Sequence, residues 1–181
     1  MSNASITKTT PEWNTINWAK VQRKVFKLQK RIFQAVKSGN KVKAKKLQKL
    51  LLKSHYAKLL AIRKVTQDNQ GKKTAGVDGK KALRPNQRLK LVDELRLEGY
   101  KAKALRRVWI PKPGRDEKRG LGIPTIKDRA MQALVKSALE PYWEAQFEGT
   151  SYGFRPGRSA HDAIGRIYTC LLYTSDAADD P

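Results

Sequence analysis

The chain has 181 residues, of which 39 are Lys or Arg and 16 are Asp or Glu, and its formal net charge is +23. This charge favours nucleic acid as a partner, because each phosphate neutralised by Lys or Arg releases condensed counterions. A single cysteine and two histidines exclude a structural zinc site, and the lack of a long apolar run excludes an export signal and a membrane-spanning helix.

The N-terminal part predicts a basic helical hairpin. Residues 1–12 are expected to form a flexible leader, and residues 13–70 a helical unit. From Trp18 to Ala35, apolar residues recur three and four apart, which places them on one face of a helix that ends near residues 38–40; they are Trp18, Val21, Val25, Leu28, Ile32 and Ala35. A second helical run starts after Asn40, with apolar positions at Ala44, Leu47, Leu51, Leu59, Leu60 and Ile62.

The other faces of this unit carry many lysines and arginines and almost no acidic residues. Two interpretations remain open: an amphipathic pair whose lysines are only solvated, or a face that contacts nucleic acid. Dense cationic charge without compensating acid is costly unless a polyanion is bound, which favours the second interpretation.

Residues 71–169 predict a second unit, which begins within a glycine-rich connector at residues 70–79. We expect this connector to be a structural turn and to mark a domain boundary. Residues 86–98 have helical spacing, and Gly99 is a suitable stop for that helix. Residues 105–110 predict a strand that ends at Pro111, with residues 121–123 as its partner and a charged turn closing the hairpin.

A further helix is expected after this hairpin. Thr125 and Asp128 resemble a capping box at its start, and Pro141 is expected to end or bend it. Ser159 and Asp162 are also predicted to cap a helix. They lie too close to His161 along the chain to form a hydrolase relay with it.

Three blocks carry a resemblance to a known family: TAGVDG at residues 74–79, RRVWIPKPGRDEKRGLGIPTIKDR at 106–129, and SYGFRPGRSAHDA at 151–163. In this order and spacing they resemble the early blocks of group II intron reverse transcriptases, also called maturases. Residues 13–63 are also similar to the N-terminal extension of that family. The resemblance implies an α+β, mainly helical fold, in which the helical hairpin precedes the fingers part of a right-hand polymerase, truncated before the palm.

The resemblance also implies site residues. Lys112 and Arg119, with Lys118 as the rival of Arg119, would meet the triphosphate of an incoming nucleotide; a merely solvated hairpin tip is the alternative. The positions expected to contact template or other nucleic acid are Arg106, Arg107, Phe154, Arg155 and Arg158. A simple structural turn is the alternative for the last three. Asp78 is not a metal ligand in the family pattern.

The last twelve residues, CLLYTSDAADDP at 170–181, differ abruptly from the basic chain before them. They resemble a translated sequencing adapter, so we expect the natural sequence to stop near Thr169. Removing their three Asp leaves 16 − 3 = 13 acidic residues and a net charge of 39 − 13 = +26. Ala178-Asp179-Asp180 imitates part of the Tyr-Ala-Asp-Asp motif of reverse transcriptases, but Ala177 stands where that motif has Tyr.

The function implied is RNA-directed DNA synthesis by a longer protein that also assists intron splicing. Its partners would be intron or template RNA, a DNA primer or target, and deoxynucleoside triphosphates. Mg²⁺ is expected in the full-length enzyme, but the fragment is expected to bind no metal and to be inactive, because the palm aspartates lie beyond the third block. The alternatives are a non-enzymatic RNA-binding splicing cofactor and a retron-type or CRISPR-associated reverse transcriptase. We expect a cytoplasmic protein associated with the nucleoid or RNA, without a membrane partner.

Overall fold

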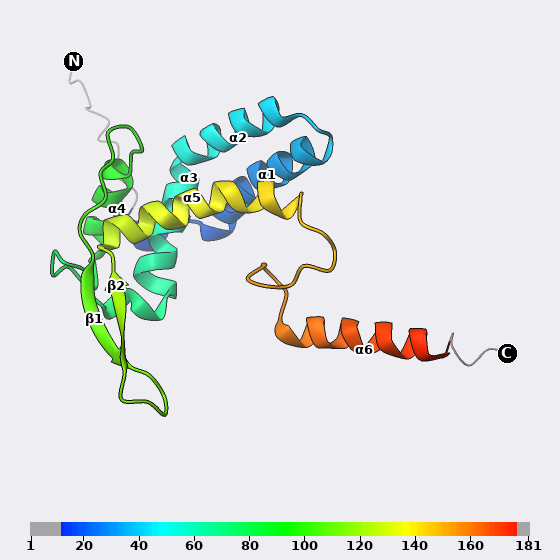
Figure 1. Cartoon of the computed structure of the whole chain (residues 1–181). Coiled ribbons are helices and arrows are strands. Elements are labelled where there is room, and N and C mark those ends of the chain that lie inside the picture. Colours follow the sequence, from blue (N-terminus) through cyan, green and yellow to red (C-terminus); the bar gives the residue numbers. More distant parts are fainter. Residues whose placement is uncertain (1–11, 177–181) are drawn as a thin grey trace, which may run out of the picture.

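A computed structural model describes residues 12–176, which form a mainly helical α+β structure with one small sheet (Figure 1). The α-helices are α1 (Trp18–Lys37), α2 (Lys41–Lys53), α3 (His55–Arg63), α4 (Pro85–Glu94), α5 (Ile126–Glu144) and α6 (Ala160–Asp176). Strands β1 (Arg106–Pro111) and β2 (Lys118–Ile123) pair antiparallel. Shorter helical turns are η1 (Trp13–Thr15), the π-helix η2 (Lys64–Asp68) and η3 (Gln70–Lys73). The predicted mainly helical α+β class is confirmed.

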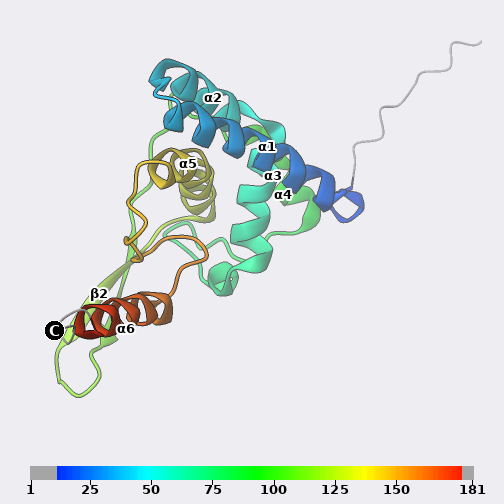
Figure 2. The same cartoon turned by 90° about the vertical axis from the view of Figure 1, so that its right-hand side faces the viewer.

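The predicted helical hairpin is formed by α1 and α2, which lie side by side in Figures 1 and 2. Asn17 and Asn40 cap the two helices, because each side-chain oxygen accepts a hydrogen bond at 2.9 Å from a backbone N–H of the first turn. Gly39 joins them with φ +73°, a conformation that suits glycine. The predicted apolar face of α1 is confirmed, since Val21, Val25, Ile32 and Ala35 are buried.

The second predicted run is two helices, a division that the sequence pattern missed. Ser54 has extended backbone angles (φ −67°, ψ 124°) and separates α2 from α3. Serine favours the position that precedes a helix, and the Ser54 carbonyl accepts a hydrogen bond from the backbone N–H of Lys58 at 3.1 Å. The break changes the direction of the chain, and Leu51 and Ile62 on either side of it are fully buried.

The helices before and after the connector share one hydrophobic core. Its fully buried members include Ile32 from α1, Leu51 from α2, Ile62 from α3 and Leu134 from α5. Leu95, directly after α4, is also fully buried in this core. Figure 2 shows α5 lying against α1, α2 and α3. The connector therefore joins two parts of one packed body among the described residues.

Helix α4 is shorter than the pattern of residues 86–98 predicted. It ends at Glu94, because Leu95 has non-helical angles (φ −80°, ψ 83°) as its side chain enters the core. Gly99 still makes a turn, with φ +66°, and the backbone N–H of Tyr100 donates to the carbonyl of Leu97 at 3.2 Å. Tertiary packing has overridden local helical spacing here.

Helix α5 continues past Pro141 to Glu144, so of the two predicted outcomes, an end or a bend at Pro141, the end is wrong. Proline has no backbone N–H, which leaves the carbonyl four residues earlier, that of Ser137, without its helical partner. The side-chain Nε2 of Gln29 in α1 donates to this carbonyl oxygen at 2.9 Å. The side-chain amide of Gln48 in α2 donates to the next carbonyl, that of Ala138, at 3.2 Å. The helical pair thus supplies the hydrogen bonds that let α5 remain intact.

Replacing Gln29 by Ala is expected to lower the free energy of unfolding by about 1–2 kcal/mol, because the Ser137 carbonyl would lose its partner in a partly buried place. Urea unfolding followed by circular dichroism measures the change. The matched control is Gln22→Ala, since Gln22 is an exposed residue of the same helix. Equal stability of the two variants would contradict the proposed role of Gln29.

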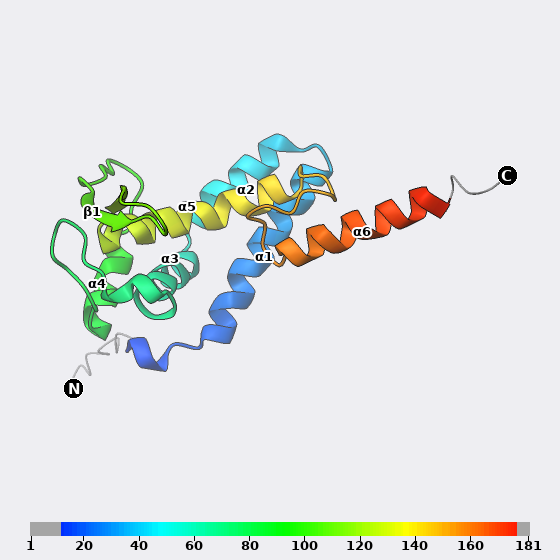
Figure 3. The same cartoon turned by 60° about the horizontal axis from the view of Figure 1, so that its bottom comes forward.

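Helix α6 extends away from the other helices (Figures 1 and 3). It exposes Ile164, Ile167 and Tyr168, and it continues across the predicted junction at residue 169 to Asp176. Residues 1–11 of the predicted leader and residues 177–181 of the predicted foreign tail, including the Ala-Asp-Asp triplet, lie outside the described residues. None of the helices within residues 12–176 has the length and apolar composition needed to span a membrane.

Candidate nucleic-acid interface

The β1–β2 hairpin projects from the helical body, as Figures 1 and 2 show. Its register pairs Ile110 with Arg119 and Pro111 with Lys118. Directly paired residues project on the same face of a two-stranded sheet, and successive residues alternate. Arg119 therefore lies on the face of Ile110, and its rival Lys118 lies on the opposite face.

Lys112 follows β1 and continues the same ladder, because its backbone N–H donates to the Glu117 carbonyl at 3.0 Å. Alternation from Ile110 places Lys112 on the face that also carries Arg119. Its Nζ donates to Glu117 Oε2 at 2.5 Å. Both side chains are exposed, and an exposed ion pair contributes only about 0–1 kcal/mol, so an incoming phosphate can displace the Glu117 carboxylate.

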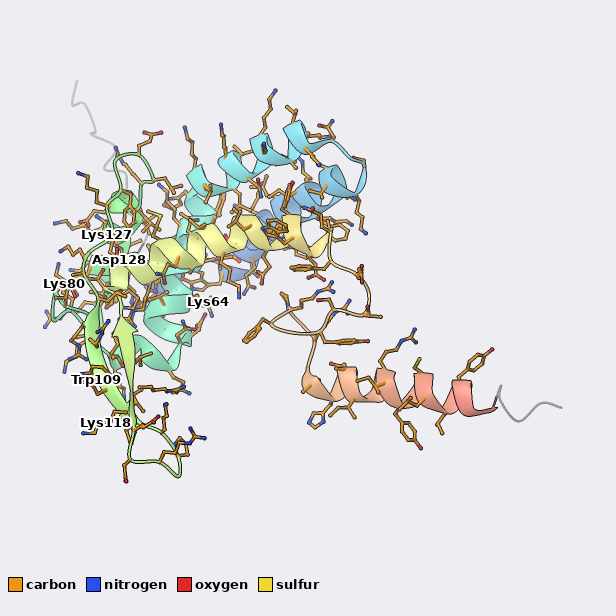
Figure 4. The ribbon with its side chains drawn as sticks, viewed as in Figure 1. Lys64, Lys80, Trp109, Lys118, Lys127 and Asp128 are labelled. Atoms are coloured by element: carbon orange, nitrogen blue, oxygen red, sulfur yellow. The ribbon has the colours of Figure 1, made fainter. Side chains whose placement is uncertain are left out.

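The opposite face of the hairpin carries Arg107 and Trp109. The guanidinium carbon of Arg107 lies 5.8 Å from the centre of the Trp109 ring. Gly120 lies against this pair, since a Cβ there would make van der Waals contact with the ring at 3.4 Å and with the Arg107 side chain at 3.5 Å. Trp109 is 59% exposed and is labelled on the hairpin in Figure 4. Its face offers a stacking surface beside a cation, the combination that binds bases of single-stranded nucleic acid.

A buried carboxylate fixes the base of the hairpin, where α5 begins (Figure 4). Asp128 Oδ2 accepts a hydrogen bond from Thr125 Oγ1 at 2.6 Å, and the backbone N–H of Asp128 donates to Thr125 Oγ1 at 3.2 Å. The hydroxyl of Tyr100 donates to the other carboxylate oxygen. Burial alone would raise the pKa of Asp128, but the hydrogen bonds from Thr125 and Tyr100 outweigh burial and hold this pKa below its ordinary value. The predicted capping box is confirmed.

The depressed pKa of Asp128 predicts a pH dependence of stability. Its contribution is complete above the ordinary aspartate pKa of 3.8 and is lost as pH falls through the lower pKa of the folded state. The Asp128→Asn variant should be less stable at pH 7 by about 1–3 kcal/mol, because an amide N–H would face a hydroxyl donor. Its stability should also fall less steeply with acid than that of the wild type. Denaturant unfolding at about pH 7 and about pH 3, on either side of the ordinary aspartate pKa, tests both effects, and parallel acid curves would contradict the assignment.

The connector is held against the start of α5. Arg129 donates through Nη1 to the Gly71 carbonyl at 2.7 Å and through Nη2 to the Thr74 carbonyl at 2.6 Å. Burial lowers the pKa of Arg129, while the nearby Asp78 opposes that shift. Gly76 packs directly on the backbone of Thr125, where a Cβ would lie only 2.7 Å from the Thr125 Cα. These contacts position the connector beside the base of the hairpin.

The loop after α5 is organised by Arg155, which is 8% exposed. Its guanidinium donates to both carboxylate oxygens of Glu144, with Nε to Oε2 at 3.0 Å, and to the carbonyls of Glu148 and Ser151 at 2.6 and 2.8 Å. The ring of Phe147 lies 5.3 Å from its guanidinium carbon. The hydrogen bond from Arg155 lowers the pKa of Glu144. Arg155 thus has an internal partner for each guanidinium nitrogen, and its contact with template stays a prediction.

Arg158 also serves the loop, because Nη1 donates to the carbonyls of Gly149 and Ser151. Its guanidinium carbon lies 5.2 Å from the Tyr152 ring, and the residue remains half-buried. Ser159 and Asp162 form the predicted helix cap, with Ser159 N–H and Oγ both donating to Asp162 Oδ2 at 2.7 Å.

Phe154 lies at the tip of this loop and is completely exposed. Its φ of +57° is in the left-handed region, which a bulky side chain rarely adopts. Such strain persists only where the surroundings impose it, and it is concentrated at sites that contact other molecules. The geometry leaves the Phe154 ring free to stack on a base or to meet an apolar partner.

An apolar groove of about 700 Å³ runs along the exposed side of α5 and reaches this loop. Its lining includes Val135, Leu139, Trp143, Phe147, Phe154 and Pro156. Apolar grooves of this size usually receive another part of a protein or a ligand.

The cationic faces of α1 and α2 remain largely uncompensated. Residues 18–53 contain no Asp or Glu. Within residues 12–176, no ion pair involves a cation of α1, and in α2 only Lys53 has one, with Glu98 at 3.6 Å. This arrangement suits contact with a polyanion.

Comparison with known proteins assigns this arrangement to a family. Residues 13–95 match the N-terminal domain of reverse transcriptase. The chain is 41% identical over 143 residues to "Maturase-like protein 1" of Euglena gracilis, which covers 76% of the chain and 30% of that protein. It is 36% identical over 101 residues to "Group II intron-encoded protein LtrA" of Lactococcus lactis subsp. cremoris, which covers 55% of the chain and 17% of that protein.

The chain belongs to the group II intron reverse transcriptase and maturase family. A further relative is "Protein YkfC" of Escherichia coli (strain K12), 41% identical over 109 residues, covering 58% of the chain and 28% of that protein. The chain spans less than a third of the length of each of these three relatives.

The structure brings together only some of the site residues predicted for this reverse transcriptase family member. Lys112 and Arg119 share one face of the hairpin, and cross-strand pairing places Arg106 on that face as well. Arg107 lies on the other face with Trp109. Arg155, Arg158 and Phe154 belong to the separate loop that follows α5.

Sequence reasoning missed Trp109 and Arg129 as residues that shape the interface. Strand alternation offered a signal for Trp109, because it places an aromatic ring on a face shared with Arg107. Nothing local signals Arg129, whose hydrogen-bond partners lie 58 and 55 residues earlier. Within residues 12–176, no group of three or more His, Cys, Asp or Glu side chains is arranged to hold a metal ion.

Proposed function

We propose that the chain is the nucleic-acid-gripping part of an RNA-directed DNA polymerase of group II intron type. In this proposal residues 71–169 act as fingers and residues 13–70 as a basic extension that contacts RNA. The observation that carries the proposal is the projecting hairpin, on which Lys112 and Arg119 share one exposed face. Cations fixed on one face of a rigid ribbon suit a triphosphate, whose charge grows during phosphoryl transfer.

Each part of the chain has a distinct role in this proposal. Lys112 leaves Glu117 and binds phosphate oxygens of the incoming nucleotide, and Arg119 adds a second cation from the neighbouring strand. Trp109 and Arg107 offer a stacking surface on the opposite face for template or primer. Mg²⁺ bound by aspartates elsewhere in a longer polypeptide would activate the primer hydroxyl and stabilise the leaving pyrophosphate.

The α5 groove supports a longer protein in the same proposal. A fingers unit separated from its palm leaves apolar surface open to water, and the groove beside Trp143 and Phe147 is such a surface. We assign the occupant of this groove to another part of such a longer protein, outside the 181-residue chain.

Binding of a deoxynucleoside triphosphate tests the central claim. Titration of the 181-residue chain with a fluorescent analogue should give saturable binding that Lys112→Gln and Arg119→Gln each weaken several-fold. Lys118→Gln is the matched control, since it removes the same charge from the opposite face of the hairpin. Equal losses in all three variants would reduce the effect to general electrostatics and would contradict a nucleotide site on one face.

Primer extension tests the assignment of catalysis to another region. The chain with a primed RNA template, deoxynucleotides and Mg²⁺ should give no product above background. Templated synthesis by the chain alone would overturn that assignment.

A second candidate function is a splicing cofactor that binds RNA without polymerising. The similarity to "Maturase-like protein 1" favours it. Under this alternative the chain binds intron RNA as tightly as the polymerase would, but Lys112 and Arg119 have no nucleotide to hold. The triphosphate titration therefore separates the two candidates.

A further inference from the structure

A second cationic site lies away from the hairpin, between the π-helix η2, the connector and α4. It is a pocket of about 410 Å³ lined by Thr66, Gln67, Lys72, Lys73, Ala82 and Arg88. We call it the cation pocket. None of its residues is among those that the sequence resemblance marked for nucleotide or template.

Its charge is one-sided. Lys72, Lys73 and Arg88 line it without any acidic side chain, and within residues 12–176 none of these three cations takes part in an ion pair. Asp68, next to Gln67 in the chain, pairs with Arg63 at 3.6 Å. Lys72 donates to the backbone carbonyl of Gln67 at 2.7 Å, a neutral acceptor that leaves its charge uncompensated.

Arg88 has an unused donor in this place. Its Nε is buried and, among the described residues, has no hydrogen-bond partner. Its guanidinium carbon lies 5.6 Å from the Trp13 ring, so the aromatic face holds the group in position. Buried polar groups nearly always find a partner, and at Arg88 an acceptor oxygen of a bound group would supply it.

The walls of the cation pocket are fixed. The indole N–H of Trp13 donates to Gln67 Oε1 at 3.0 Å, and the backbone N–H of Ala82 donates to the Lys72 carbonyl at 3.2 Å. Ala82 has φ +50°, a strained value for a residue other than glycine. The π-helical turn that contributes Thr66 and Gln67 is itself a rare geometry, which is frequent at functional sites.

We propose that the cation pocket binds a phosphate group. Arg suits phosphate because its planar guanidinium presents paired donors, and each Lys adds a point charge. The inference rests on the proposed nucleic-acid function and adds a second anchoring point to it, on the helical body rather than on the hairpin. The phosphate comes either from the backbone of a bound RNA or from a free anion.

RNA binding by the full chain tests the proposal, with fluorescence anisotropy of a labelled single-stranded RNA measured over a range of KCl concentrations. Lys73→Gln and Arg88→Gln should each weaken binding by about five- to tenfold. Each should also make the negative slope of log affinity against log salt shallower by about 1, the value for one phosphate that is no longer neutralised. Lys80→Gln, directly after the connector, and Lys90→Gln in α4 are charge-matched controls at exposed residues outside the pocket and should change the slope less.

Lys73 is the decisive position, because its side chain is exposed and its replacement does not disturb packing, whereas Arg88 also contacts Trp13. If Lys73→Gln behaves like the two controls while wild-type RNA binding stays strong, the cation pocket does not hold a backbone phosphate of RNA, and the proposed function is unaffected. Absence of RNA binding by the wild type itself would instead refute the proposed function.

Inorganic phosphate distinguishes the two sources. If phosphate at matched ionic strength raises the melting temperature of the wild type but not of Lys73→Gln, a free anion is enough to fill the pocket. If Lys73→Gln weakens RNA binding while phosphate stabilises neither protein, the pocket takes a backbone phosphate of RNA. Failure of both probes to distinguish Lys73→Gln from the controls overturns the proposal.

Discussion

RNA affinity of the chain is expected to fall by about a thousandfold or more between about 50 mM and about 200 mM salt, if roughly six or more phosphates are contacted. The physical reason is the release of counterions by a chain of net charge +23, in which α1 has no acidic residue and no ion pair within the described residues. Anisotropy titrations of a labelled RNA over a series of salt concentrations give the slope directly.

The slope also decides between the two interpretations of the basic helical pair. Lys24, Lys27 and Lys30 are exposed residues of α1. If they bind RNA, replacing all three by Gln should make the negative slope shallower by about one for each phosphate that the variant no longer neutralises. An unchanged slope would mean that these cations are only solvated, and RNA binding would then be confined to the hairpin, the loop after α5 and the cation pocket.

Much of the fold follows from local pattern. The three- and four-residue spacing of Val21, Val25 and Ile32 predicted α1, because one buried stripe is enough to specify an amphipathic helix. The hairpin followed from two apolar segments around a charged turn, and the start of α5 from Thr125 and Asp128. These features depend on residues close together in the chain.

The pattern failed where distant residues decide the backbone. Pro141 breaks no helix, because Gln29, 108 residues before Ser137, satisfies the carbonyl that proline leaves free. Leu95 ends α4 early because the core takes its side chain. In both places tertiary packing, and not the spacing of apolar residues, decides where the helix ends. A single sequence does not show that packing.

The candidate site also contains some features that the sequence marks and others that only the folded chain shows. Sequence resemblance marked Lys112 and Arg119, and cross-strand register places Arg119, unlike its rival Lys118, on the face of Lys112. The same resemblance marked Arg155, whose ion pair with Glu144 and hydrogen bonds to backbone carbonyls exist only in three dimensions. The cation pocket gave no sequence signal, since its residues come from four separate stretches of the chain, at 66–67, 72–73, 82 and 88.

Replacing Gly76 by Ala is expected to have the largest effect of any single methyl group added to the chain. The new Cβ would lie 2.7 Å from Thr125 Cα, 2.8 Å from Thr125 N and 2.9 Å from the carbonyl carbon of Pro124. All three are backbone atoms, so no side chain can rotate away. Overpacking of this kind costs about 1–3 kcal/mol, and the strain falls on the residue that caps α5 and supports the hairpin.

Two measurements test the Gly76→Ala prediction, one of stability and one of RNA binding. Urea unfolding should show the loss of stability, and RNA anisotropy at low salt should show weaker binding, because the connector and the base of the hairpin move apart. Gly149→Ala is the matched control: a Cβ there meets nothing within 4 Å, and neither glycine has a left-handed φ. If Gly76→Ala is as stable as Gly149→Ala and binds RNA equally well, the connector does not position the hairpin, and the helical body and the hairpin bind RNA independently.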